Sequence, residues 1–530
     1  MTPISWTFPY PTRRMPVFAD QAVATSQPLA AAAGIRALAA GGNAVDAALA
    51  TAITLTVVEP TSNGIGSDAF ALIWDGGRLH GINGSGRSPA GWTPERFGGL
   101  TRIPPFGWDS VTVPGAVDVW ARLSARFGRL PFADLFTPAI RYARDGFVVS
   151  PVTAAAWAAW PEPDNQLPGF VRTFLPYGRA PQPGDRFRCP DQAETLAAIA
   201  DSRGESFYRG DLARRIVRQA EAEGGAMTLA DLADHEADWV TPISVDYRDV
   251  RLHEIPPNGQ GIAALIALGI LSHFDLPALP PDSADALHLQ IEAMKIAFAE
   301  VNRHLADPDH MTVSPQALID PEVLAGHART IRMDRAAPAG GSPPAEPGTV
   351  YLTAADADGM MVSYIQSNFA GFGSGVVIDG TGISLQNRGV GFSLTPGHPN
   401  QVGPRKRPFH TIIPGFVTRR DGTPLMSFGV MGGHMQPQGH VQMIVRIADF
   451  GQNPQAACDA PRWHVCPDGR VAVEPEFDPA VIETLSRRGH WIDTTPPRFG
   501  FGGAQLILKL DSGGYCAASD GRKDGMAMGF

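Results

Sequence analysis

Residues 349–367 read TVYLTAADADGMMVSYIQS, and this stretch decides the fold. Apolar and polar residues alternate on both sides of Asp358-Gly359, and both flanks contain β-branched and aromatic residues. Such alternation around an Asp-Gly pair is typical of two antiparallel strands joined by a tight turn. The sequence therefore predicts a β-hairpin whose first strand begins at Thr349.

The segment before this hairpin, residues 336–348, reads AAPAGGSPPAEPG and has no apolar periodicity, which is typical of an exposed linker. It offers a cleavable bond between Gly348 and the strand that begins at Thr349. A free N-terminal threonine carries its own base, because its α-amino group can take the hydroxyl proton. The pattern fits a cut that makes Thr349 an N-terminal nucleophile, and it also fits a plain linker that meets a strand.

Further along the chain, residues 427–450 read SFGVMGGHMQPQGHVQMIVRIADF. An apolar strand is followed by Gly432-Gly433 and then by a helical pattern. Adjacent backbone N–H groups at the start of a helix can stabilise the oxyanion that forms when an amide is attacked. This pair is a candidate oxyanion site, although a glycine pair is also common in an ordinary turn.

On the N-terminal side, residues 26–60 predict two helices. Ser26 is expected to cap the first helix, Gly41-Gly42 to end it, and residues 44–57 to form the second. Helical and strand patterns also recur later in the chain, and no internal repeat is found. Helices are predicted at 117–127, 131–145, 192–200, 211–223, 284–305, 438–449 and 479–488. Two short strands are predicted within 69–84, around a turn at 75–77, and further strands at 375–379, 410–418, 424–430 and 503–510.

Composition excludes several classes of protein. Over 530 residues the net charge is −10, and no long basic run offers a nucleic-acid surface. The four cysteines form no C-x-x-C pair, and the 14 histidines show no paired metal spacing, so no metal or cofactor is expected. The longest apolar run, 261–271, is about half of what a membrane span needs. Without a recognisable secretory signal near the start, a soluble, cytoplasmic protein is expected.

A series of motifs then resembles one family along nearly the whole chain, namely the γ-glutamyltranspeptidases with their related acylases and amidohydrolases of the N-terminal-nucleophile class. In chain order the motifs are GGNAVDAALATAITLTVVEP, SVTVPGAVDVW, PAIRYARDGF, PNGQGIAAL, FGSGVV, GPRKRPFHTIIP, GGHMQPQGH, DAPRW and ASDGRKDG. The resemblance implies an α/β fold, a four-layer αββα sandwich. It also implies a proenzyme cut into a large part, 1–348, and a small part, 349–530, which remain interlocked.

The resemblance assigns roles to catalytic residues. Thr349 matches the family's nucleophile, Thr353 matches a later hydroxyl of the cleavage motif, and Gly432 and Gly433 match the oxyanion pair. No cofactor is implied. The family usually carries a second Thr and a His directly after the nucleophile, whereas this chain has Val350 and Tyr351 there.

The expected substrate pocket departs from the family. The transpeptidases hold the glutamyl carboxylate with two Ser, where this chain has His410 and Thr411. They hold the glutamyl ammonium with a Gln and an acidic residue, where this chain has Arg388 and Gly391. An added guanidinium and a missing carboxylate favour an anionic group. The family's other carboxylate-binding Arg is replaced by Arg87 two positions away, which is either a substrate group or a solvated loop charge.

These residues predict a self-processing N-terminal threonine amidohydrolase that acts on an amide of a small acidic acyl group, such as oxamate or a glutaryl amide. A glutathione hydrolase or γ-glutamyltransferase is the alternative enzyme. An uncleaved, inactive relative that serves as a binding protein is the alternative of another class. Expected partners are the small-molecule amide and the two parts of one precursor; whether the protein also forms a homodimer is left open.

Overall fold

The structure is a computed structural model of the chain, and it describes residues 14–159, 165–338, 348–495 and 499–530. The predicted hairpin is confirmed: β10 (Val350–Ala355) pairs antiparallel with β11 (Met361–Ser367), and Thr349 directly precedes β10. The Asp356 carboxylate fixes the turn by accepting the backbone N–H of Asp358 and of Met360.

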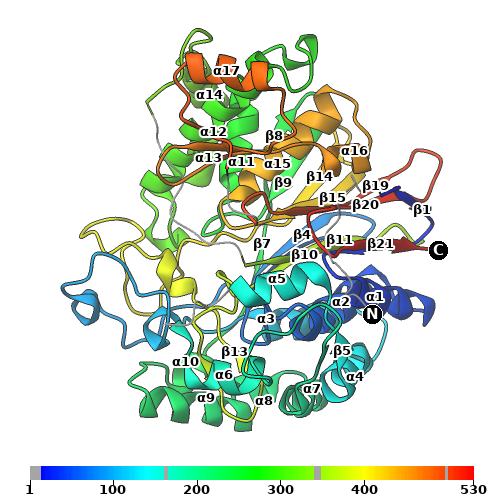
Figure 1. Cartoon of the computed structure of the whole chain (residues 1–530), viewed down its shortest axis with the longest axis vertical. Helices are drawn as coiled ribbons and strands as arrows, with labels where there is room; N and C mark the ends of the chain where they lie inside the picture. Colours follow the sequence, from blue (N-terminus) through cyan, green and yellow to red (C-terminus); the bar gives the residue numbers. More distant parts are fainter. Residues whose placement is uncertain (1–13, 160–164, 339–347, 496–498) are drawn as a thin grey trace, which may run out of the picture.

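The hairpin lies inside a seven-stranded antiparallel sheet, and a second such sheet is stacked on it (Figure 1). The first sheet has the order β21 (Met526–Gly529), β2 (Ala22–Thr25), β10, β11, β3 (Asp68–Trp74), β4 (Leu79–Asn83) and β7 (Asp238–Val240). The second has the order β1 (Val17–Ala19), β20 (Tyr515–Ser519), β19 (Gly503–Lys509), β15 (Pro424–Met431), β14 (Gly415–Arg419), β9 (Val250–Glu254) and β8 (Ile243–Tyr247).

Helices cover the outer face of each sheet, and three apolar cores separate the layers. On the hairpin sheet lie α1 (Pro28–Ala39) and α2 (Ala44–Val58), with α3 (Ala116–Phe127), α4 (Thr137–Asp145), α7 (Pro190–Ser202) and α9 (Asp211–Ala222) nearby. On the other sheet lie α11 (Gly261–Leu271), α12 (Ala284–His304), α15 (Met435–Ile444) and α17 (Pro479–Arg487). Residues such as Phe70, Ile365 and Phe416 fill the space between the sheets. The predicted four-layer αββα sandwich is confirmed.

One predicted helix cap is wrong. Helix α1 is capped by Gln27, whose side-chain oxygen accepts the N–H groups of Leu29 and Ala30. The hydroxyl of Ser26 instead donates to the Glu59 carboxylate over 2.5 Å. The strands β8, β9, β20 and β21 were not predicted, because each is only four or five residues long and so offers little periodicity to recognise.

Each sheet contains strands from both predicted parts. β10 pairs with β2 on one side and β11 pairs with β3 on the other, so strands after position 349 lie between strands from before position 348. Most of the predicted linker, residues 339–347, lies outside the described residues. Among the helices of the described ranges, none combines the length and apolarity that crossing a membrane requires.

Candidate active site

Thr349 is held at the start of β10 by a serine on the opposite strand. Its hydroxyl donates to Ser367 Oγ over 3.1 Å, and Ser367 Oγ donates to the carbonyl oxygen of Gly348 over 2.6 Å. The backbone N–H of Phe369 in turn donates to Ser367 Oγ over 2.7 Å. Thr349 is only 2 % exposed. The bond predicted to be cut is therefore fixed at its carbonyl oxygen, next to the hydroxyl predicted to attack it.

Position 348 has no room for a side chain, and only glycine fits there without movement of the backbone. A Cβ built on it would lie 2.2 Å from the backbone nitrogen of Gly371 and 2.8 Å from the carbonyl oxygen of Phe369. Contacts below about 3 Å require the backbone to move. The residue before the predicted cut is thus pressed against the loop that follows β11.

The glycine pair lies where β15 ends and α15 begins. Gly432 and Gly433 have φ values of +123° and +60°, a region that favours glycine. The Gln260 side chain fixes the pair by donating to the carbonyl oxygens of Gly433 and of Thr411, over 2.9 and 2.6 Å. Gly432 and Thr349 line one cavity of about 140 Å³. The arrangement agrees with an oxyanion site beside the predicted nucleophile.

Arg388 is a buried side chain with unused hydrogen-bond donors, and it is linked to the glycine pair through Thr411 and Gln260. Its side chain is 1 % exposed, and Nη1 donates to Thr411 Oγ1 over 2.6 Å. Its Nε and Nη2 atoms have no hydrogen-bond partner among the described residues. The Phe369 ring covers the guanidinium at 4.9 Å. Burial lowers the pKa of Arg388 to about 9, so the group stays charged at neutral pH and can receive an anion.

The negative charge of Asp68 raises the pKa of Arg388, against the effect of burial. The Asp68 carboxyl group also contacts the ring of His410. His410 Nε2 lies 3.0 Å from Asp68 Oδ2, and both side chains are fully buried. Burial raises the pKa of Asp68 to about 7 and lowers the pKa of His410 well below its usual value. Neutral His410 therefore donates from Nε2. His410 was expected to contact substrate, but its ring is engaged with Asp68 and only Thr411 of that pair touches Arg388.

The loop that carries Arg388 has no room for an acidic side chain at Gly391. A Cβ there would lie 2.4 Å from the carbonyl oxygen of Phe409. At Gly391 the backbone of this loop is thus packed closely against the backbone of Phe409. No other carboxylate takes that place from this loop.

Thr353 is not brought to the site, contrary to the expectation. Its hydroxyl lies 2.5 Å from Ser427 Oγ in the space between the two sheets, and the residue is fully buried. Thr353 lies four positions after Thr349 on an extended strand, about 13 Å further along the chain. The hydroxyl that contacts Thr349 belongs to Ser367 instead.

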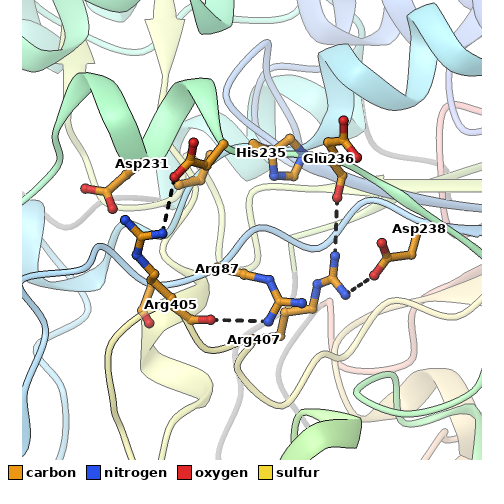
Figure 2. A pocket seen from close by; sticks show the side chains of 10 residues that line it. Arg87, Asp231, His235, Glu236, Asp238, Arg405 and Arg407 are labelled. Atoms are coloured by element: carbon orange, nitrogen blue, oxygen red, sulfur yellow. Dashed lines mark hydrogen bonds and ion pairs between the residues drawn. The ribbon is translucent and has the colours of Figure 1, made fainter.

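Figure 2 shows Arg87 with other residues that line its cavity. It lines a separate cavity of about 370 Å³ that shares no lining residue with the cavity of Thr349. Arg87 donates to the carboxylate of Asp307 and to the carbonyl oxygen of Arg405, each over about 3 Å. The side chain is 41 % exposed and its charge is paired. The solvated-loop reading is the better one for this residue.

One side-chain cluster has the composition of a metal site. His288, Glu292 and His490 are buried with their ligand atoms close together. However, His288 Nδ1 lies 2.8 Å from His490 Nε2, and Lys295 Nζ contacts both Glu292 and His490. These groups satisfy one another, and an ammonium among them opposes a cation.

Sequence reasoning missed Ser367 and Gln260. Ser367 could have been predicted from the hairpin turn. When the chain folds back at Asp358, position 367 lies opposite position 349, in agreement with the observed pairing of Val350 with Gln366. Gln260 carries no such signal, since it reaches Gly433 across 173 residues.

Comparisons with known proteins place the chain among one family of enzymes. Residues 30–530 match the family model described as Gamma-glutamyltranspeptidase. The oxamate amidohydrolase proenzyme of Klebsiella pneumoniae is 37 % identical, covering 95 % of this chain and 97 % of the relative. The glutathione hydrolase-like YwrD proenzyme of Bacillus subtilis is also 37 % identical, covering 96 % and 98 %. The crystal structure of cephalosporin acylase from Bacillus halodurans superposes with a TM-score of 0.94 at 48 % identity, covering 99 % of both chains.

Proposed function

Because this chain belongs to the γ-glutamyltranspeptidase family, we propose that it matures by cutting its own Gly348–Thr349 bond and then uses Thr349 to hydrolyse amides of small acidic acyl groups. The family makes it an amide hydrolase of the N-terminal-nucleophile class. The choice of bond, nucleophile and acyl group is our inference. The single observation that carries the acyl group is the buried Arg388, with donors that no described residue uses.

Self-cleavage follows from the contacts around Gly348. Thr349 Oγ attacks the carbonyl carbon of Gly348, whose oxygen already accepts a hydrogen bond from Ser367. The backbone C–N bond breaks as the ester C–O bond forms, and the proton of the hydroxyl passes to the departing amine. Water then hydrolyses the ester. The products are a carboxylate at Gly348 and a free α-amino group on Thr349.

Turnover repeats this chemistry on a substrate. The α-amino group takes the proton of Thr349 Oγ as the oxygen attacks the amide carbon, and it returns the proton to the leaving amine. The N–H groups of Gly432 and Gly433 are placed to stabilise the oxyanion. Water then cleaves the acyl-enzyme ester and regenerates the threonine.

The acyl group is inferred from charge. A substrate carboxylate on Arg388 would use the free Nε and Nη2 donors in a fork of hydrogen bonds, with Thr411 beside it. An α-ammonium group would meet the same guanidinium, and Gly391 offers no carboxylate to hold it. The names of two relatives, an oxamate amidohydrolase and a cephalosporin acylase, are consistent with an acyl group other than γ-glutamyl.

A comparison of three substrates tests the proposal. The cut protein is expected to hydrolyse oxamate or a glutaryl anilide at least about 10-fold more efficiently, in kcat/KM, than γ-glutamyl anilide, because like charges in a desolvated site repel. Release of ammonia or aniline measures the rates. A clear preference for γ-glutamyl anilide would favour a glutathione hydrolase or transferase instead. A persistently uncut, inactive chain would favour a binding protein.

The pH dependence of KM should report on Asp68. Burial raises the pKa of this carboxyl to about 7, so it is neutral below that pH and anionic above it. The anion would compete with the substrate carboxylate for Arg388, and KM for a glutaryl anilide is therefore expected to rise as the pH passes about 7. In Asp68→Asn this rise should be absent, whereas kcat should still increase as the α-amino group of Thr349 loses its proton near pH ~8. Initial rates measured from pH 5.5 to 9 give KM and kcat at each pH. If KM rises with pH in Asp68→Asn as it does in the wild type, Asp68 is not the group responsible for the rise.

A further inference from the structure

The cavity of Thr349 has a second side, away from Arg388. From Gly433 a chain of hydrogen bonds runs through Gln260 and Thr411 to Arg388. The neighbouring Gly432 faces the other way, because a Cβ on it would lie 3.0 Å from the Cα of Gly502. The oxyanion pair thus separates an Arg388 side from a Gly502 side.

Lys523 reaches the cavity from the Gly502 side. It lines the same cavity of about 140 Å³ as Thr349 and Gly432. Its stem lies on the backbone of Gly503, where a Cβ would come within 2.6 Å of Lys523 Cγ. Its ammonium lies 5.8 Å from the centre of the Phe499 ring, which lines the cavity too. The glycine at 503 therefore makes room for a lysine side chain that points toward the site.

The charge of Lys523 is not neutralised by a close partner. Within the described ranges, its ammonium makes no hydrogen bond or ion pair, whereas buried Lys295 and Lys406 both have oxygen partners. Glu59 is close enough to feel Lys523, but burial raises its pKa to about 7 and its carboxylate accepts a hydrogen bond from Ser26. A cation that lines a reaction cavity beside an aromatic ring, without a hydrogen-bonded oxygen partner in the described ranges, is suited to an anionic ligand.

We propose that Lys523 binds a carboxylate on the departing amine, so that the preferred substrate carries one carboxylate on each side of the scissile amide. This deepens the proposed function and rests on it: Arg388 would hold the acyl carboxylate and Lys523 the amine carboxylate. The chemistry is ordinary hydrolysis, in which water supplies OH to the acyl carbon and H to the leaving nitrogen. The substrate class narrows to N-dicarboxyl-acyl amino acids or similar carboxylated amines, and simple primary amides would leave Lys523 unused.

Two substrates that differ only in the amine test this. In 4-(glutarylamino)benzoate the departing amine carries a carboxylate, and in 4-(glutarylamino)benzamide a neutral amide of the same shape replaces it. The cut protein is expected to prefer the benzoate about 10-fold in kcat/KM, mainly through KM, as one hydrogen-bonded charge pair would give. Lys523→Met keeps the stem length and should bring the ratio close to one, and Lys523→Arg should retain most of it.

Lys509→Met is the matched control. It removes the same charge from β19, near the hairpin turn at Gly359, and it should keep the wild-type ratio. As a measurement on the unaltered protein, 4-aminobenzoate should inhibit more strongly than 4-aminobenzamide. Equal ratios in the wild type and Lys523→Met, with both substrates hydrolysed, would overturn the role of Lys523 and leave the proposed function intact. Failure of the cut wild type to hydrolyse either substrate would overturn the glutaryl-type acyl group, and this inference with it.

Discussion

A Thr349→Ala protein is expected to remain one uncut chain and to lose hydrolysis by at least ~10⁴-fold, the scale on which removal of a nucleophile acts. Both effects have one cause, because the same oxygen attacks Gly348 during maturation and the substrate afterwards. The alanine should fold, since the lost hydroxyl contacts only Ser367 Oγ and that atom keeps its bonds to Gly348 and Phe369. Denaturing gels and mass determination of the two fragments show the cut, and amine release shows turnover.

Two variants separate the roles in this prediction. Thr349→Ser keeps an oxygen on an N-terminal residue and should mature and turn over. Ser367→Ala removes the donor to the Gly348 carbonyl and should slow maturation without preventing it, because the attacking oxygen remains. Should Thr349→Ala still yield fragments that begin at residue 349, another group performs the cut and the assignment of the nucleophile is wrong.

Replacing Arg388 by methionine is expected to lower kcat/KM for a glutaryl anilide about 100-fold, mostly through KM, because a desolvated charge pair with a carboxylate is lost. The fold should tolerate the change. Asp68, which would be left without its nearest cation, already has a pKa of about 7 and can take up a proton. Arg388→Lys should recover part of the activity, since an ammonium offers charge without the planar fork of donors.

Arg87→Met is the matched control for that experiment. It removes an equal charge from the separate cavity in Figure 2 and should change kcat/KM by less than about 2-fold, because Arg87 is partly exposed and its cavity shares no lining residue with that of Thr349. The reverse pattern, with a large loss in Arg87→Met and a small one in Arg388→Met, would move the carboxylate site to Arg87.

Local sequence pattern predicted the parts of the fold that local forces determine. The alternation around Asp358 predicted the hairpin, and the step from an apolar strand to a helix predicted the glycine turn at Gly432 between β15 and α15, because each depends on neighbours in sequence. Thr353 was misplaced for a geometric reason. Motif spacing counts residues along one strand, whereas the hydroxyl that meets Thr349 comes from across the hairpin.

The substrate side could not be resolved from sequence because it is built from distant segments. From the sequence, both Arg87 and Arg388 were candidates to bind the substrate carboxylate. The folded structure shows that Arg87 is paired with Asp307, whereas Arg388 is buried with unused hydrogen-bond donors. The engagement of His410 depends on Asp68, which is 342 positions away. Lys523 lies within the motif ASDGRKDG, but only the folded structure shows that it lines the same cavity as Thr349.

The pairing of strands from the two predicted parts within each sheet affects how this protein can refold. An uncut chain folds in a unimolecular reaction, because all strands belong to one molecule. After a cut at Gly348–Thr349, β10 and β2 would belong to different molecules, and refolding from the denatured state would require a bimolecular encounter that costs translational and rotational freedom worth about 4–15 kcal/mol. The working enzyme would then persist through the slowness of its unfolding, with no ready route back once its two chains diffuse apart.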